Sequence, residues 1–170
     1  EILFSASAIA RRNLELAKDI AARDYNDLLV ISILKGSFIF AADLIRAMHD
    51  AGISPEVEFI FISSYGAGTE SSGRVAINRD VTEGVAGRQV LLIDDILESG
   101  RTLAFARDAL RARGAEVRIC VLLDKPGKRK TALEADFTGF VCPDRFVVGY
   151  GLDYAHYYRE LPYIGLVEGR

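Results

Sequence analysis

Cysteine and histidine are scarce in this 170-residue chain, which contains two of each. Cys120 and Cys142 are too few for a disulfide scaffold, so free thiols in a reducing, cytoplasmic setting are expected. His49 and His156 lie far apart in the sequence, and no spacing of cysteine and histidine indicates zinc. These shortages argue against a small secreted disulfide protein and against a zinc protein.

Long apolar runs and an excess of positive charge are also lacking. No apolar stretch approaches the roughly 18 residues that a membrane-spanning helix needs, so no membrane partner is expected. No apolar segment or cleavage site follows Arg11 and Arg12, so no signal peptide is predicted. The formal net charge of −3 argues against a nucleic-acid partner. A phosphate loop of the GxxxxGKS or GxxxxGKT type is missing, which argues against a nucleoside triphosphatase.

The chain does have a regular alternation of strand and helix patterns. Half of its residues are apolar, and its length suits a single domain over residues 1–170. Continuous apolar runs, typical of parallel strands buried on both faces, lie at residues 28–34, 57–62, 89–93 and 117–123. Helices are expected at residues 5–24, 38–51 and 102–113, a short strand at 74–78, and two strands of a smaller lobe at 137–141 and 146–150. The alternation predicts an α/β fold: a mostly parallel open sheet flanked by helices on both faces.

The most informative segment is the run VLLIDDILESGRTL at Val90–Leu103. An apolar strand stops at two adjacent acids, Asp94 and Asp95, and Glu98 then precedes a Ser-Gly-Arg-Thr turn that opens a helix. The first N–H groups of a helix lack internal partners, and the helix dipole favours an anion beside them. Ligands of open α/β sheets bind beyond the carboxyl ends of the strands. This order of residues therefore predicts a site for a sugar that carries phosphates.

This run resembles the 5-phosphoribosyl 1-diphosphate signature of the type I phosphoribosyltransferases. Four further parts of the sequence resemble the hypoxanthine-guanine phosphoribosyltransferase family. Residues 34–36 resemble its pyrophosphate loop, and residues 64–65 resemble the start of its mobile catalytic loop. Lys125 resembles the lysine that reads the purine 6-oxo group, and Phe146–Gly165 resembles the C-terminal purine and pyrophosphate segment. The resemblance implies the type I phosphoribosyltransferase fold with a small C-terminal hood lobe.

The matched stretches reach from about Leu28 to Val167 and imply a reaction of purine salvage. The 5-phosphoribosyl group would pass from 5-phosphoribosyl 1-diphosphate to N9 of hypoxanthine, or of guanine, giving IMP or GMP and pyrophosphate. Mg²⁺ is the implied cofactor. Asp94 and Asp95 would meet the ribose hydroxyls directly or through this ion, and Asp153 would hold a second ion.

The resemblance also assigns the groups that bind the donor. Lys35 and Arg159 would hold the leaving pyrophosphate, the lysine as a point charge and the arginine as a two-pronged donor. The family often has a cis peptide before this lysine, so one is expected between Leu34 and Lys35. The remaining donor-binding residues would be Gly36, Ser64 and Tyr65 on two loops and Ser99, Gly100, Arg101 and Thr102 at the helix start.

Glu98 is where the chain departs from the family pattern, which usually has aspartate there. The resemblance makes it the general base near N7 of the purine. Glutamate reaches about 1.5 Å further than aspartate, and a misplacement near 1 Å can lower a rate about 10²-fold. Three outcomes stay open: the loop backbone compensates, the base is less effective, or a water intervenes.

Purine recognition is assigned to Lys125, which would donate to the 6-oxo group. The backbone of Val147 and Asp153 would read the ring edge, while Phe146 stacks on one face and Ile96 packs on the other. Adenine presents an amine where the oxo group would be, which leaves two donors facing each other. The sequence does not rank hypoxanthine, guanine and xanthine, because contacts to the purine 2-position are largely made by backbone.

Residues 65–73 (YGAGTESSG) are rich in glycine, serine and threonine and are expected to close over the site as a lid. An alternative function is a regulatory protein on the same fold that senses 5-phosphoribosyl 1-diphosphate without turnover. Family members are commonly dimers or tetramers, so the resemblance implies a homodimer or homotetramer.

Overall fold

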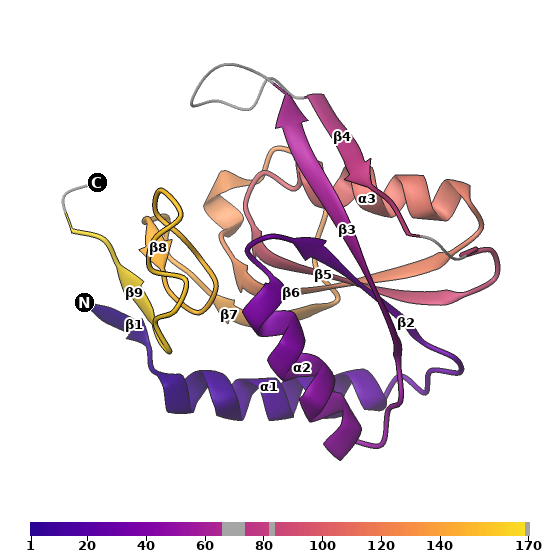
Figure 1. Ribbon diagram of the computed structural model, residues 1–170, viewed down its shortest axis with the longest axis horizontal. Helices are drawn as coiled ribbons and strands as arrows, with labels where there is room; N and C mark the ends of the chain where they lie inside the picture. The colour runs from indigo at the N-terminus through magenta and orange to yellow at the C-terminus, as the bar shows by residue number, and fades with distance from the viewer. Residues whose placement is uncertain (66–73, 82–83, 169–170) are drawn as a thin grey trace.

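A six-stranded sheet with the order β4-β3-β2-β5-β6-β7 forms the centre of the computed structural model (Figure 1). The structure describes residues 1–65, 74–81 and 84–168. The strands are β2 (Leu29–Leu34), β3 (Glu56–Tyr65), β4 (Arg74–Arg79), β5 (Gln89–Leu97), β6 (Glu116–Asp124) and β7 (Phe137–Val141). All neighbouring pairs are parallel except β3 and β4, which are antiparallel. The predicted mostly parallel open sheet is confirmed.

Helices cover both faces of this sheet, as predicted (Figure 1). Helices α1 (Ala6–Ala21) and α2 (Phe38–Asp50) share one apolar core with Val30 and Leu91 of the sheet. Helix α3 (Arg101–Ala112) shares the opposite core with Leu29 and Val90. Successive strand residues point to opposite faces, so a strand with a core on each side must be apolar at every position. Among the described residues, no helix is both long and apolar enough to span a bilayer.

A second, smaller sheet lies beside the main one and has the order β1-β9-β8 (Figure 1). It consists of β1 (Ile2–Phe4), β8 (Val147–Val148) and β9 (Ile164–Leu166), paired antiparallel. We call this sheet, with the turns between β8 and β9, the hood. Two predictions were wrong here: β7 belongs to the main sheet, where it pairs with β6, and the strand expected at 146–150 is only two residues long. The chain turns sharply at residues 149–151, where three successive φ angles are positive.

Strand β5 is longer than predicted, and this changes the position of the two acids. The predicted strand ended at Ile93, whereas β5 continues to Leu97 because β6 pairs with it as far as Asp124. Its pairing with β2 on the other side ends at Ile93. Asp94 and Asp95 therefore lie inside a strand that has lost its neighbour on one side. Strand β3 is also longer than predicted and reaches Tyr65.

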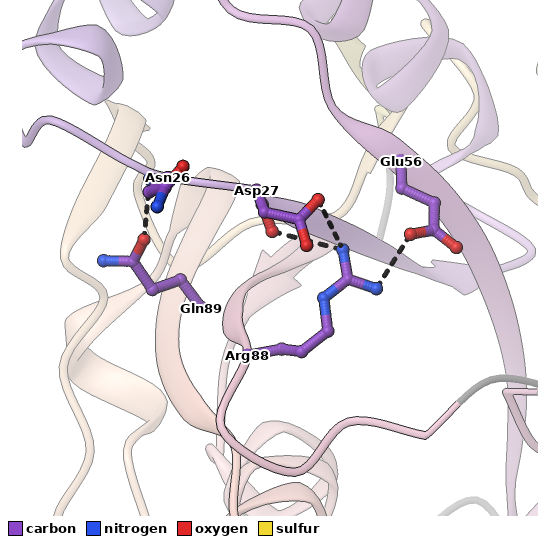
Figure 2. Close-up of polar contacts among 5 residues, drawn as sticks. All are labelled: Asn26, Asp27, Glu56, Arg88 and Gln89. Carbon is purple, nitrogen blue, oxygen red and sulfur yellow. Dashed lines mark hydrogen bonds and ion pairs between the residues drawn. The ribbon is translucent and has the colours of Figure 1, made fainter.

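A polar cluster joins the amino ends of β2, β3 and β5, at the edge opposite the acids (Figure 2). The Arg88 guanidinium donates to Glu56 Oε2 at 2.8 Å and to the Asp27 carbonyl oxygen at 3.1 Å. The backbone N–H of Asn26 donates to Gln89 Oε1 at 2.8 Å. The Arg88 side chain is only 17% exposed. This cluster ties three strand starts together, so we expect it to stabilise the sheet without touching the candidate site.

Candidate functional site

A cavity of about 410 Å³ opens at the carboxyl ends of β2 and β5. It gathers residues that the sequence analysis assigned to one site: Lys35, Gly36, Asp94, Asp95, Ile96, Glu98, Ser99, Gly100 and Thr102. Ile33, Leu34, Ile62, Leu97 and Leu103 also line it and were not predicted. Apolar strand residues carry no sequence signal that separates a cavity wall from a core.

The turn after β2 is held by two buried serines. Ser32 Oγ and Ser37 Oγ lie 2.8 Å apart in a hydrogen bond, and Ser37 Oγ also donates to the Ile33 carbonyl oxygen. The peptide between Leu34 and Lys35 is cis, as the resemblance implied. The Lys35 ammonium lies 5.8 Å from the ring centroid of Phe61. The turn thus presents one positive charge at the edge of the cavity.

Gly36 of this turn lies directly against Asp95. A Cβ atom built on Gly36 would lie 1.9 Å from Asp95 Oδ2, so any other residue there would displace the Asp95 carboxylate. Glycine therefore lets the turn after β2 pass the acid pair without moving it. The backbone of the loop after β2 therefore lies against the side chain of Asp95 in β5.

Asp94 and Asp95 are adjacent carboxylates, of which Asp94 is buried and Asp95 is half-buried. Asp94 is 9% exposed, and burial together with the neighbouring charge of Asp95 raises its pKa well above the ordinary value. Burial also raises the pKa of Asp95, although hydrogen bonds from Asp94 and from the Ile96 N–H act in the opposite direction. A divalent cation would offset this uncompensated charge, so the donor chemistry of the pair fits Mg²⁺. Among the described residues, no group of three or more acids, histidines or cysteines is clustered for a metal.

The start of α3 lines one part of the cavity. Gly100 is the N-cap residue, with a φ of 86°, and Ser99 Oγ accepts from the Arg101 N–H at 3.3 Å. The Ser99 carbonyl oxygen accepts from the backbone N–H groups of Lys130 and Thr131 at 2.8 Å and 3.0 Å. The segment that follows Lys125 therefore supports the turn at the helix start from behind.

Glu98, which lines the cavity, forms an ion pair with Lys125, which is buried and not among the lining residues. Lys125 Nζ donates to Glu98 Oε1 at 2.9 Å. The lysine side chain is 5% exposed and the glutamate side chain is 44% exposed. The buried lysine is thus held by the one acid that the sequence analysis named as a base.

The hood carries the other predicted residues, which the structure does not place among the lining residues of the cavity. Phe146 is 40% exposed and meets Tyr154 edge to face, with the ring centroids 5.8 Å apart. Val147 is buried in β8. An Arg159 nitrogen donates to the Gly151 carbonyl oxygen at 2.6 Å, and another lies 3.4 Å from Asp153 Oδ1. Asp153 therefore meets Arg159 in the hood and not the Asp94–Asp95 pair.

Three predicted features lie outside the cavity or outside the described residues. Ser64 and Tyr65 are the last residues of β3, where their backbone pairs with Val75 and Arg74 of β4. The rest of the expected lid, residues 66–73, lies outside the described part of the chain. Arg101 is the first residue of α3 and is exposed.

Tyr150 was not predicted as a site residue. Its hydroxyl makes two hydrogen bonds to the helices that cover the sheet, to Asn13 and to Asp43. The only sequence signal was its place between two glycines. Its partners are 137 and 107 residues away in the sequence, so no local pattern reveals them.

Comparisons with known proteins show which family this chain is similar to. Residues 1–155 match the family model of the phosphoribosyl transferase domain. The chain is 45% identical to the hypoxanthine-guanine phosphoribosyltransferase of Bacillus subtilis, over 99% of this chain and 93% of that protein. It is also 45% identical to the bifunctional protein TilS/HprT of Listeria innocua, where 99% of this chain spans 26% of that protein. A solved structure of a Staphylococcus aureus hypoxanthine phosphoribosyltransferase superposes with a TM-score of 0.92 at 41% identity, covering 99% of this chain and 91% of the other.

Proposed function

Because this chain belongs to the hypoxanthine-guanine phosphoribosyltransferase family, we propose that it is the corresponding enzyme of purine salvage. It transfers the 5-phosphoribosyl group of 5-phosphoribosyl 1-diphosphate to N9 of hypoxanthine or guanine, in a magnesium-dependent reaction that releases pyrophosphate. One observation carries the proposal: a single cavity combines the Lys35–Gly36 turn, the Asp94–Asp95 pair and the start of α3.

The 5′-phosphate binds at the start of α3 in this proposal. The N–H groups of the first helical turn have no partners within the helix, and the dipole of a twelve-residue helix favours an anion there. The hydroxyls of Ser99 and Thr102 add donors, and Arg101 adds positive charge. The ribose then points along β5 toward the acid pair.

Asp94 and Asp95 bind the ribose hydroxyls and Mg²⁺, and Asp153 is the residue for a second ion. A bound Mg²⁺ would offset negative charge on the donor and on the carboxylates. The raised pKa values of Asp94 and Asp95 support this role, because they show carboxylate charge that the protein itself does not neutralise.

The leaving pyrophosphate is held by Lys35 and Arg159. Lys35 lies in the cavity beside Gly36, and Arg159 lies in the hood, bonded to Gly151, which packs against the Gly36 carbonyl oxygen. The carbonyl oxygen of Gly151 and the carboxylate of Asp153 orient the guanidinium before the ligand arrives. An oriented guanidinium loses less freedom on binding a phosphate than a free one.

Glu98 and Lys125 act on the purine. Glu98 accepts the purine proton near N7, and Lys125 donates to the 6-oxo group. In the free protein each holds the other, so an entering oxopurine replaces Glu98 as an acceptor for Lys125. Phe146 and Ile96 pack against the purine faces, and the backbone of Val147 and Asp153 reads its edge.

The remaining parts of the proposal concern the protein as a whole. Residues 1–170 act as one catalytic unit in the cytoplasm, as a homodimer or homotetramer. The regulatory alternative gains no support, because the relatives named above are enzymes.

A spectrophotometric assay tests this function. The protein is incubated with hypoxanthine, 5-phosphoribosyl 1-diphosphate and Mg²⁺, and nucleotide formation is followed by absorbance; guanine, xanthine and adenine replace hypoxanthine in parallel reactions. Turnover with an oxopurine, but not with adenine or after chelation of Mg²⁺, is the expected result. Donor binding without turnover on any oxopurine would instead support the sensing alternative.

A further inference from the structure

The hydroxyl of Tyr150 is the centre of a buried hydrogen-bond network that joins the hood to both helices of one face. Asn13 Nδ2 of α1 donates to the Tyr150 hydroxyl at 2.9 Å, and this hydroxyl donates to Asp43 Oδ2 of α2 at 2.6 Å. Tyr150 is 6% exposed. Burial and the hydrogen bond to Asp43 raise the pKa of Tyr150, so the phenol stays protonated and remains a donor.

This tyrosine lies in the middle of the sharp turn at residues 149–151, where Tyr150 has a φ of 52°. The turn is fastened to the segment that carries Arg159. Tyr150 N donates to the Leu161 carbonyl oxygen at 2.8 Å, and Gly151 N donates to the Arg159 carbonyl oxygen at 2.9 Å. The Arg159 guanidinium also donates a hydrogen bond to the Gly151 carbonyl oxygen, at 2.6 Å. The direction of the Arg159 side chain therefore depends on where this turn lies.

The same turn packs on the loop after β2. A Cβ atom built on Gly151 would lie 2.8 Å from the Gly36 carbonyl oxygen and 3.3 Å from Ile39 Cγ1. Gly36 in turn touches Asp95 on its other side. A continuous line of contacts thus runs from the acid pair through Gly36 and Gly151 to Tyr150, and from there to α1 and α2.

We propose that Tyr150 is a positioning residue for the leaving pyrophosphate. Through Asn13 and Asp43, its hydroxyl holds the turn at 149–151, and with it Arg159, against the Lys35–Gly36 loop. The inference rests on the proposed function, since it takes Lys35 and Arg159 as the two pyrophosphate ligands. It adds residues that touch no substrate but set the distance between those ligands.

The location of the network predicts which group of the donor binds more weakly when the network is broken. The start of α3, the Glu98–Lys125 pair and the acid pair are all carried by β5, β6 and the segments that follow them. Lys35 and Arg159 lie on the elements that Tyr150 connects, the loop before α2 and the hood, whereas no residue of the proposed 5′-phosphate subsite does. Loss of the hydroxyl should therefore weaken binding of the diphosphate group and spare the 5′-phosphate subsite.

Tyr150→Phe tests the proposal, because it removes the hydroxyl and keeps the ring. Binding of two probes is measured by calorimetry in the presence of Mg²⁺: 5-phosphoribosyl 1-diphosphate, and ribose 5-phosphate, which lacks the diphosphate. We expect the first to bind about tenfold more weakly, as for a small misplacement of binding groups, and the second to bind as it does to the unchanged protein. In steady-state assays, KM for the diphosphate donor should rise.

Arg88→Ala is the matched control, because it breaks a polar cluster at the opposite edge of the sheet (Figure 2). It should lower thermal stability without weakening the binding of one probe more than that of the other. Equal weakening of both probes by Tyr150→Phe would show general loosening of the fold and would overturn the proposal, as would unchanged binding of both.

Asp43→Asn keeps the tyrosine and serves if Tyr150→Phe does not fold. It replaces the charged acceptor by a neutral one and should shift donor binding in the same direction by a smaller factor. Donor affinity equal to that of the unchanged protein would contradict the proposal. If the unchanged protein binds the donor but forms no nucleotide, the proposed function fails, while the comparison of the two probes still decides the role of Tyr150.

Discussion

Lys125 Nζ and Glu98 Oε1 lie 2.9 Å apart, so the proposed purine-reading lysine and the proposed base neutralise each other in the free protein. The lysine is buried and the glutamate is partly exposed. An oxopurine that enters the site must take over the ammonium while the carboxylate turns to the ring. The aspartate of the family pattern has a side chain shorter by one methylene and would reach less far toward Lys125.

Replacement of the base is the most direct test of the pair. Glu98→Gln keeps the shape and a hydrogen-bond acceptor for Lys125 but removes the basic carboxylate. We expect kcat for hypoxanthine to fall by about 10²- to 10⁴-fold, the usual contribution of general acid–base catalysis. Steady-state kinetics measure this, with calorimetry of donor binding as the control. Near-normal turnover would remove Glu98 from the mechanism.

Shortening the side chain tests whether the ion pair opposes substrate binding. In Glu98→Asp, the carboxylate no longer reaches Lys125 as closely, and the lysine is more available to the 6-oxo group. Since partly exposed ion pairs contribute about 0.2–1 kcal/mol, KM for hypoxanthine should fall about 1.4- to fivefold. A higher KM would mean that the longer glutamate is the better fit in this chain. The accompanying change in kcat tests the longer side chain. A rise in kcat would show that glutamate is the less effective base, and an unchanged kcat would show that the loop backbone compensates for its length.

Removal of the lysine should separate purine binding from donor binding. Lys125→Ala deletes a charged donor to the 6-oxo group, and hydrogen bonds to charged groups contribute about 1.5–3 kcal/mol. We expect KM for hypoxanthine to rise at least about tenfold, with donor affinity unchanged in calorimetry. Lys128→Ala is the control, because it removes the same charge from an exposed lysine that pairs with Asp144. A selective loss of donor affinity in Lys125→Ala would refute the assignment.

Neutralising one carboxylate of the acid pair should stabilise the ligand-free protein. The pKa of Asp94 is raised in the folded state, so the folded protein holds this proton more tightly than the unfolded chain. Stability from this group is therefore greatest below the unfolded-state pKa near 4 and is lost as pH rises through the folded-state value. Asp94→Asn removes this loss of stability at higher pH and keeps an acceptor oxygen for the Asp95 N–H.

The expected result for Asp94→Asn is a higher Tm at neutral pH and a flatter dependence of Tm on pH above about 4. A gain of about 1 kcal/mol corresponds to roughly 2–4 °C in a domain of this size. Thermal unfolding without Mg²⁺ measures the effect, and the same variant should lose the stabilisation that Mg²⁺ and donor give the unchanged protein. A lower Tm than that of the unchanged protein would show that the ionised carboxylate is stabilising.

The sequence predicted the layers of this fold because its strands show where both cores lie. Leu29 and Val30 face opposite cores, and a strand that needs apolar residues on both faces is legible as a continuous run. The end of β5 was predicted too early, because two acids are typical of a strand end and the pairing partner that extends it, β6, is not visible in the run itself. Strands β1 and β9 were missed because each has three residues and exists only by pairing across the whole chain.

The candidate site was predictable wherever a motif is contiguous. Asp94, Asp95 and the start of α3 lie in one run of fourteen residues, and the structure brings them into one cavity. The Glu98–Lys125 pair spans 27 residues, and the Tyr150 network spans more than 100. Such contacts depend on how elements pack, and a side chain far from its partner carries no local pattern that reveals it.

The pairing of Ile2–Phe4 with Ile164–Leu166 has a practical consequence for anyone who modifies this protein. The first and last strands are neighbours in the sheet that also contains Val147 (Figure 1). A short linker joining them would span little distance, so circular permutants with a new opening in an exposed turn far from the cavity are feasible. Deleting the first strand, by contrast, would leave Ile164–Leu166 without one of its two neighbours and loosen the part of the molecule that carries Phe146.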